Sequence, residues 1–385
     1  YFGESRANLG QMLKGEQRIG EHTYYLNNSG VLQYGWQKLN NEWRYFDPAD
    51  GAELETETDV TYWVTIHMPD GTTERSFINN RATVLKGWQT IAGKRYYFDA
   101  GGLIWTEAKG WLIIGNNRYY FNEKEDDSVY QGFLELTDGA GNRQTYYLNA
   151  NGQMLKGWQT IKIGNVSGRY YLDPTTGEAW MGHQKIGNNW YYFDPSDQGK
   201  MTVGYIQDAA GNGYYYNTSG VRQYGWQRIN NVWHYFMPQS GVECKVTIDE
   251  YYWAVIELGD GTRERAFIRN GSSILKGWQM INGQRYYFDS NGFQWREDKG
   301  WLVIGSNRFY FDEDKNNSVH QGFLELEEEG KGKQTYYLNN NGQALKGWQT
   351  IKVGTISGRY YLDPADGSIW MGHQKVGSYW YYFDP

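Results

Sequence analysis

The sequence pairs Gly87-Trp88-Gln89 with Arg95-Tyr96-Tyr97-Phe98-Asp99, two aromatic stretches separated by a Gly-Lys turn. Both return about 190 residues later, as Gly277-Trp278-Gln279 and Arg285-Tyr286-Tyr287-Phe288-Asp289. Each stretch also belongs to a series of units of about twenty residues that fills nearly the whole chain. A short fixed period predicts a solenoid of stacked small units, and the longer period predicts two lobes with the same kind of surface.

Every unit reads as strand, turn, strand, turn. Gly-Trp opens a short strand, an Asn-Asn, Gly-Asn or Gly-Lys pair makes a tight turn, an aromatic strand follows, and Asp-x-x-Gly or Asn-x-x-Gly closes the unit. The units open near Gly15, Gly35, Gly87, Gly110, Gly132, Gly157 and Gly182, and again near Gly204, Gly225, Gly277, Gly300, Gly322, Gly347 and Gly372. Divergent hairpins at Thr61–Val84 and Tyr251–Ile274 interrupt the series, and no amphipathic helix pattern is present. The sequence therefore predicts an all-β solenoid of stacked hairpins.

The duplication places one lobe at residues 1–193 and a second at 194–385. The chain is 39% hydrophobic but 18% aromatic, so we expect amphipathic rings to supply its burial and to remain partly at its surface. Because the sequence starts and stops inside repeats, we expect it to be a piece of a larger secreted protein.

Charge and composition exclude several partners. The net charge is −7 with no Lys/Arg cluster, which argues against nucleic acid. No apolar run is long enough for membrane insertion. The single cysteine, Cys244, cannot form an internal disulfide and is interpreted as an incidental free thiol.

Strand parity sorts the rings of each unit. Tyr96 and Phe98 share the apolar face and are assigned to the solenoid interior, whereas Tyr97 lies on the other face. Trp88 lies opposite Ile91, so its ring is expected to point outward or into the seam between units. The pattern predicts a ladder of Trp and Tyr along grooves between successive hairpins.

These units resemble the cell-wall-binding or glucan-binding repeats of secreted bacterial proteins, a superfamily of extracellular β-solenoids. Choline-binding members enclose a quaternary ammonium with two Trp and a Tyr, one Trp standing directly before the Tyr-Tyr pair. Only Trp43, Trp190, Trp233 and Trp380 fill that place, and the units of Trp190 and Trp380 carry His183 and His373 where the opening Trp belongs. Elsewhere the place is taken by Arg95, Arg118, Arg169, Arg285, Arg308 and Arg359. An arginine there repels choline and donates hydrogen bonds that suit sugar hydroxyls, so the pattern looks more like the glucan-binding branch.

A sugar ring needs a flat aromatic platform and planar polar side chains at its edge. The candidate carbohydrate-binding residues are Trp63, Trp253, Trp88, Trp278, Trp111, Trp301, Trp158, Trp348, Tyr97, Tyr287, Gln89, Gln279, Arg95 and Arg285. The alternative for the Gly-Trp rings is plain packing between units. Trp63 and Trp253 lie in the divergent hairpins, outside the repeat pattern, and are the rings least explained by such packing.

Catalytic and metal chemistry find little support. Of the six histidines only His183 and His373 correspond between lobes, with no Ser/His/Asp or His-x-x-x-His arrangement beside them. The stretch Asp312–Asn316 lacks the spacing of an EF-hand loop and is interpreted as a solvated acidic loop. We expect no enzymatic activity, no metal site and no cofactor.

The sequence thus predicts a non-catalytic, two-lobed region that binds an α-glucan polysaccharide, starch-like or dextran-like, at several sites at once. We expect the parent protein to be secreted or on the surface or cell wall of a Gram-positive bacterium. Two alternatives stay open. One is cell-wall anchoring through the choline of teichoic acid, and the other is a structural spacer or receptor-binding repeat region.

Overall fold

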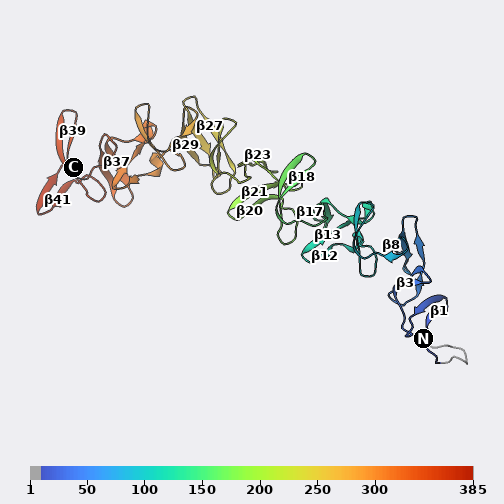
Figure 1. Ribbon diagram of the computed structural model, residues 1–385. Coiled ribbons are helices and arrows are strands. Elements are labelled where there is room, and N and C mark those ends of the chain that lie inside the picture. The colour runs from blue at the N-terminus through green and yellow to red at the C-terminus, as the bar shows by residue number, and fades with distance from the viewer. Residues whose placement is uncertain (1–9, 385) are drawn as a thin grey trace. The chain divides into compact units, whose positions relative to one another are not determined.

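A computed structural model describes residues 10–384 as a succession of antiparallel β-hairpins, with no α-helix among them (Figure 1). The prediction of an all-β solenoid of stacked hairpins is confirmed. The hairpins of the first half are β1 (Gly15–Ile19) with β2 (His22–Leu26), β3 (Gly35–Leu39) with β4 (Glu42–Phe46), β10 (Gly87–Ile91) with β11 (Lys94–Phe98), β12 (Leu112–Ile114) with β13 (Asn117–Tyr119), β16 (Gly132–Thr137) with β17 (Arg143–Leu148), β18 (Gly157–Ile163) with β19 (Val166–Leu172), and β20 (Gly182–Ile186) with β21 (Asn189–Asp194).

The second half repeats the series. Its hairpins are β23 (Gly204–Gln207) with β24 (Gly213–Tyr216), β25 (Gly225–Ile229) with β26 (Val232–Phe236), β31 (Gly277–Ile281) with β32 (Gln284–Phe288), β33 (Leu302–Ile304) with β34 (Asn307–Phe309), β37 (Gly322–Glu328) with β38 (Gly332–Leu338), β39 (Gly347–Val353) with β40 (Ile356–Leu362), and β41 (Gly372–Val376) with β42 (Tyr379–Phe383). Short strands and 3-10 turns join them: β5 (Glu53–Leu54), β14 (Phe121–Asn122), β15 (Ser128–Val129), β22 (Lys200–Met201), β35 (Phe311–Asp312), β36 (Ser318–Val319), η1 (Glu107–Lys109), η2 (Glu123–Glu125), η3 (Pro195–Asp197), η4 (Glu297–Lys299) and η5 (Glu313–Lys315).

The divergent segments are larger sheets than the sequence indicated. Their central hairpins are present, as β7 (Trp63–His67) with β8 (Thr73–Asn79) and β28 (Trp253–Glu257) with β29 (Arg263–Arg269). The flanking strands are β6 (Thr56–Thr58), β9 (Thr83–Val84), β27 (Glu243–Ile248) and β30 (Ser273–Ile274). They extend the first hairpin to a four-stranded sheet and join the second to β25 and β26 in a six-stranded sheet.

The chain folds into two compact units. Of the described residues, the first unit holds 10–186 together with 192–202, and the second holds 187–191 together with 203–384. In the part of the chain that the structure covers, none of the helical turns has the length and apolarity needed to cross a bilayer.

Strand register explains how each hairpin packs on two sides. In β10 and β11, Trp88 pairs with Tyr97 and Gln89 pairs with Tyr96. Tyr96 and Phe98 are buried in a cluster with Ile104, which confirms their interior assignment. Trp88 and Tyr97, on the opposite face, pack against a second cluster built by the following unit. Each hairpin therefore closes its own core with one face and supports the next unit with the other.

Glycine is required where each unit closes. Gly102 has a φ of +83°, a conformation that side-chain-bearing residues rarely adopt. A Cβ at this position would lie 2.5 Å from Cγ1 of Val84. The closing turn therefore approaches the neighbouring strand too closely for any larger residue.

Candidate functional site

The Gly-Trp rings lie in the seams between units, half-buried. The Trp88 ring centroid is 5.2 Å from that of Tyr97 and 4.6 Å from that of Tyr119, which belongs to the next hairpin. In the second unit, the Trp278 centroid is 5.2 Å from that of Tyr287 and 4.6 Å from that of Phe309. The rings of Trp111, Trp158, Trp301 and Trp348 pack likewise, each against a tyrosine of its own hairpin and an aromatic ring of a later unit. One side of each Gly-Trp ring is thus committed to packing.

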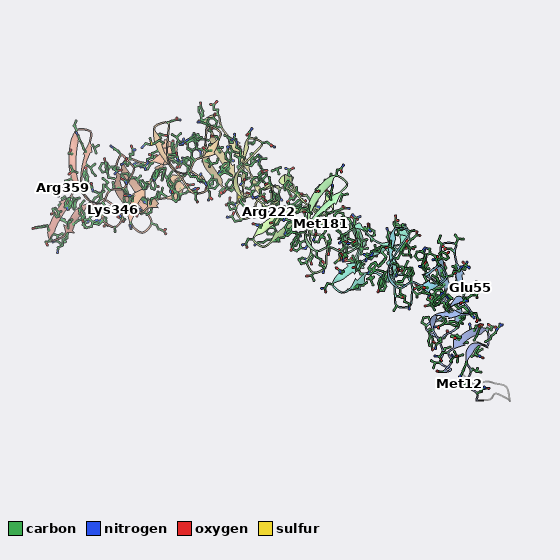
Figure 2. All side chains as sticks on the ribbon, viewed as in Figure 1. Met12, Glu55, Met181, Arg222, Lys346 and Arg359 are labelled. Atoms are coloured by element: carbon green, nitrogen blue, oxygen red, sulfur yellow. The ribbon has the colours of Figure 1, made fainter. Side chains whose placement is uncertain are left out.

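An arginine covers each of these six indoles. In every case the arginine stands directly before the Tyr-Tyr or Phe-Tyr pair of the same unit, and Figure 2 labels one of them, Arg359. The Cζ–centroid distances are 3.8 Å for Arg95 on Trp88, 4.5 Å for Arg118 on Trp111, 4.2 Å for Arg169 on Trp158, 3.9 Å for Arg285 on Trp278, 4.0 Å for Arg308 on Trp301 and 4.4 Å for Arg359 on Trp348. Because a guanidinium at this distance makes a cation–π contact, the chain supplies its own cation to each ring.

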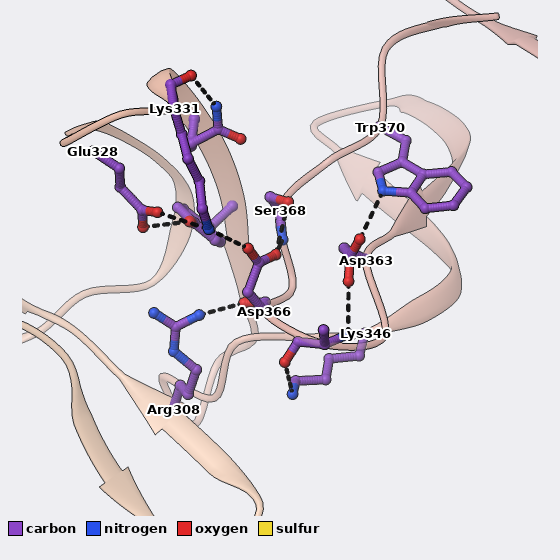
Figure 3. A network of polar contacts seen from close by, with 11 residues as sticks. Arg308, Glu328, Lys331, Lys346, Asp363, Asp366, Ser368 and Trp370 are labelled. Atoms are coloured by element: carbon purple, nitrogen blue, oxygen red, sulfur yellow. Dashed lines mark hydrogen bonds and ion pairs between the residues drawn. The ribbon is translucent and has the colours of Figure 1, made fainter. Parts of the chain in front are cut away.

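The same arginines connect units that are not adjacent. Nη1 of Arg95 donates to the carbonyl of Asn151 at 2.5 Å, and Nη1 of Arg285 donates to that of Asn341 at the same distance. Both carbonyls belong to closing turns two hairpins further along. Arg308 repeats the contact on the carbonyl of Asp366 (Figure 3). The guanidinium therefore joins unit n to unit n + 2 while it covers the indole of unit n.

The turn that accepts from Arg308 carries a polar network of its own (Figure 3). The Asp366 carboxylate lies 2.8 Å from Nζ of Lys331 and accepts hydrogen bonds from the backbone N–H and hydroxyl of Ser368. Partial burial acts to raise the pKa of Asp366, but the hydrogen bonds from Lys331 and Ser368 outweigh burial and lower the pKa to about 2. The network ties this turn to the turn between β37 and β38, which carries Lys331.

The two divergent-hairpin tryptophans are not equally accessible. Trp63 is partly buried, whereas Trp253 is 8% exposed and belongs to a core cluster. Each ring carries an arginine 4.4 Å from its centroid, Arg75 on Trp63 and Arg265 on Trp253. Contrary to the expectation for the divergent hairpins, Trp253 offers no exposed face. Sequence reasoning missed this burial because neither hairpin follows the repeat from which neighbours were inferred.

The two candidate glutamines bond to their own turns. Nε2 of Gln89 donates to the carbonyl of Lys86 at 2.7 Å, and Nε2 of Gln279 donates to that of Lys276 at 2.7 Å. Oε1 of Gln279 also accepts a hydrogen bond from Arg269 at 2.8 Å. These amides brace the entry to each hairpin, so their hydrogen-bonding capacity is partly used inside the protein.

Two units have a tryptophan both in the opening Gly-Trp stretch and at the position that arginine takes in the six units above. Trp36 and Trp43 lie edge to face at 6.5 Å, and Trp226 and Trp233 do so at 6.2 Å. The second pair lines a pocket of about 430 Å³ together with Tyr224 and other residues. The indole N–H of Trp226 donates to the Asn291 carbonyl, and that of Trp233 donates to the Gly271 carbonyl.

Each lobe also has a polar groove, and the two grooves lie at equivalent positions. The first, of about 550 Å³, is lined by Thr90, Gly93, Lys94, Arg95, Asn122, Glu125, Ser128, Val129, Tyr130, Gln131 and Ala150. The second, of about 750 Å³, is lined by Met280, Gly283, Gln284, Arg285, Lys315, Ser318, Val319, Gln321, Asn340, Asn341 and Gln343. Nine of these positions coincide after a shift of 190 residues, so the duplication carries a concave polar surface as well as a fold. Of the candidate residues from the sequence, only Arg95 and Arg285 line these grooves.

Among the described residues there is no metal-binding cluster, and the one thiol is buried. Across residues 10–384, no three His, Cys, Asp or Glu side chains are grouped to hold a metal ion. Cys244 is buried, and burial raises the pKa of its thiol.

Two protein-family models match repeats of this chain. A model of the choline-binding repeat matches residues 13–56, 85–133, 141–183 and 275–323, and a model of the cell wall binding repeat matches residues 183–196 and 225–242. Comparison with curated proteins found no match.

Several solved structures are similar to this chain. CbpJ from Streptococcus pneumoniae is 19% identical over 82% of this chain and 100% of its own, with a TM-score of 0.33. Choline binding protein F from the same species is 21% identical over 90% of this chain and 98% of its own, with a TM-score of 0.34. An alternansucrase in complex with isomaltononaose is 19% identical over 82% of this chain and 19% of its own, with a TM-score of 0.24.

The matched repeats include the Gly-Trp strands, Tyr-Tyr strands and closing turns of the units that contain Trp88, Trp158 and Trp278, whereas residues after 323 lie outside the matches. Repeats of this kind form cell-wall-binding or carbohydrate-binding modules of cell-surface and extracellular proteins. The chain belongs to the family of choline-binding and cell wall binding repeats.

Proposed function

We propose that this chain is a non-catalytic binding region that holds an α-glucan polysaccharide, starch-like or dextran-like, through two lobes, residues 1–193 and 194–385. The observation that carries the proposal is the pair of duplicated polar grooves, each lined by an arginine and by amide side chains. Amides and guanidinium groups match the donors and acceptors at the rim of a sugar ring.

The arginine-covered tryptophans support a sugar over a cation. A quaternary ammonium needs the negative face of an indole, and in six units a guanidinium already lies on that face. A second cation at the same ring would meet both a filled surface and a like charge. Trp88 and Trp278 then serve as the backing of Arg95 and Arg285, whose other N–H groups are proposed to bond to sugar hydroxyls.

Multiple weak sites suit a polymer. One sugar subsite on an open, hydrated surface binds weakly, because few contacts offset the loss of motional freedom. Two covalently linked lobes raise the local concentration of the second site once the first is occupied. We therefore propose attachment to a polysaccharide as the role of this region in a larger secreted protein of a Gram-positive bacterium.

Native gels that contain amylopectin, dextran or a mucin-type glycan test the proposal. The chain should be retarded by an α-glucan gel and should run as in an empty gel when the glycan is mucin-type. Arg143 is exposed and outside both grooves, so Arg143→Ala is the matched control for arginine substitutions within them. Equal mobility in all gels would contradict α-glucan binding.

Choline on teichoic acid is a second candidate, favoured by one pocket. Trp226, Trp233 and Tyr224 line a space of about 430 Å³ whose lining contains no arginine, although Lys276 contributes to it. If this pocket encloses a quaternary ammonium, millimolar choline should quench tryptophan emission, and Trp233→Ala should abolish the quenching. A choline response without retardation by any glucan would make cell-wall anchoring the function.

A further inference from the structure

The two grooves differ at the residues that form their opposing walls. In the first groove, Nζ of Lys94 on β11 lies 2.9 Å from Oε2 of Glu125 on η2, so an ion pair joins the two walls. Nζ of Lys94 also lies 3.9 Å from the Asp126 carboxylate. A ligand that enters this groove must displace the pair or bind around it.

The second groove has no equivalent pair. Gln284 stands where the first groove has Lys94, and its Oε1 accepts a hydrogen bond from the Tyr286 hydroxyl on its own strand. Lys315 stands where the first groove has Glu125, and its Nζ lies 2.9 Å from Asp312 within its own turn. Gln284 and Lys315 therefore each interact with a residue of their own wall of the groove.

The features beneath these walls are the same in both grooves. Gln131 and Gln321 donate from Nε2 to the carbonyls of Ala150 and Asn340, at 3.0 and 2.8 Å. In each groove one arginine, Arg95 or Arg285, donates to a closing turn at 2.5 Å. The two grooves therefore have equivalent polar floors. Only the first groove is crossed by an ion pair, in agreement with its smaller volume, about 550 Å³ against about 750 Å³ for the second.

We infer that the two lobes are unequal sugar sites: the second groove is the primary subsite for a neutral polysaccharide, and Lys94–Glu125 makes the first a weaker, salt-sensitive version of it. This inference rests on the proposed function. Both members of the pair are solvent-exposed, so the pair is a weak barrier that dissolved salt screens. An exposed pair of this kind changes an equilibrium by about 2- to 5-fold.

The inference is tested in the full chain by exchanging Lys94 and Glu125 with their counterparts in the second groove, Gln284 and Lys315. Lys94→Gln with Glu125→Lys gives the first groove the residues of the second, and should tighten retention by α-glucan gels about 2- to 5-fold at low ionic strength. Gln284→Lys with Lys315→Glu gives the second groove the bridge, and should weaken retention by a similar factor. At high ionic strength both differences should disappear. Glu325→Lys with Lys333→Glu reverses an exposed ion pair outside the grooves and is the control.

A matched pair of single substitutions supplies a second readout. Gln321→Ala should weaken retention more than Gln131→Ala, although both remove the same hydrogen bond to a closing turn. If the unsubstituted chain is retarded while the exchanged variants match it and the two glutamine variants are equal, the inequality of the lobes is refuted and glucan binding stands. If the unsubstituted chain is not retarded by any glucan, the proposed function and this inference both fall.

Discussion

At the scale of single residues, the side chain before each Tyr-Tyr pair decides what the neighbouring indole can bind. Arginine places a guanidinium 3.8 to 4.5 Å from the ring, whereas in the unit of Trp226 and Trp233 the tryptophan pair lines an open pocket. Trp190 is an exception to this rule: it stands directly before a Tyr-Tyr pair, yet the Cζ of Arg222, from a later turn, lies 4.9 Å from its ring centroid. A tryptophan in the choline-type position is thus insufficient evidence of an open cage.

Removing one such arginine should expose a cation site. In Arg95→Ala the face of Trp88 loses its guanidinium, so millimolar choline should quench tryptophan emission more than in the unsubstituted chain. Fluorescence titration measures the change, with Arg143→Ala as the control. An unchanged titration would show that an open indole face alone does not accept a quaternary ammonium here.

The Asp366 network should make the second unit sensitive to acid. The pKa of Asp366 lies at about 2 in the folded protein, below its ordinary value of 3.8. A depressed carboxylate pKa stabilises the fold above the ordinary pKa, and that stabilisation is lost as the pH falls from about 4 to about 2.

Asp366→Asn should therefore lower the free energy of unfolding by about 0.5 to 1 kcal/mol at pH 7, a range set by the solvent exposure of the Asp366–Lys331 pair. At pH 2, where Asp366 is about half protonated in the folded protein, most of this difference should be lost. Denaturant unfolding at the two pH values measures this, and Asp314→Asn, on an exposed turn, serves as control. An equal loss at both pH values would show that the charge of Asp366 is not involved.

At the scale of elements, most of the fold could be predicted from the repeat period of the sequence and from the alternation of side chains along each strand. The spacing of Gly-Trp and Tyr-Tyr stretches predicted the hairpins, and alternation along Arg95–Asp99 predicted that Tyr96 and Phe98 are buried. Three of the four flanking strands are only two or three residues long, as in Thr56–Thr58, which is too short for an alternating pattern to be recognised. The arginine contacts were missed as contacts because they join a side chain to a turn two hairpins away, which spacing within one unit does not reveal.

The two divergent hairpins should respond to substitution as core elements. Trp253 is 8% exposed and packs against Phe267 and Tyr286, so Trp253→Ala should destabilise the second unit by about 3 to 5 kcal/mol. Thermal unfolding measures the loss, and Trp380→Ala is the control because that ring is 69% exposed. A melting temperature unchanged by Trp253→Ala would contradict the core placement and would restore this ring as a candidate ligand contact.

At the scale of the whole molecule, two lobes matter only if one polymer engages both. A long dextran spans several subsites, whereas a short isomalto-oligosaccharide occupies one. If both lobes hold one polymer, Gln131→Ala together with Gln321→Ala should weaken binding to the long chain by the product of the two single-site losses. The same double substitution should weaken binding of the short ligand at each site by only a few fold, because each site loses a single hydrogen bond.

Isothermal titration with the two ligands separates these effects. Equal losses for the long and the short ligand would show that the lobes bind independently. The groove residues on which this prediction depends emerged from the folded chain, since Gln131 and Gln321 stand outside the Gly-Trp and Tyr-Tyr stretches that define the units.

The arginine bonds that reach two hairpins ahead constrain how such a chain can lengthen. Inserting one extra hairpin between Arg95 and Asn151 would carry the acceptor carbonyl away from its donor, and deleting one would do the same. Copying an entire block leaves every donor and acceptor at its original separation, as the recurrence of the contact at Arg285 and Asn341 illustrates. Growth by block copying is therefore structurally easier for this protein than growth by single hairpins.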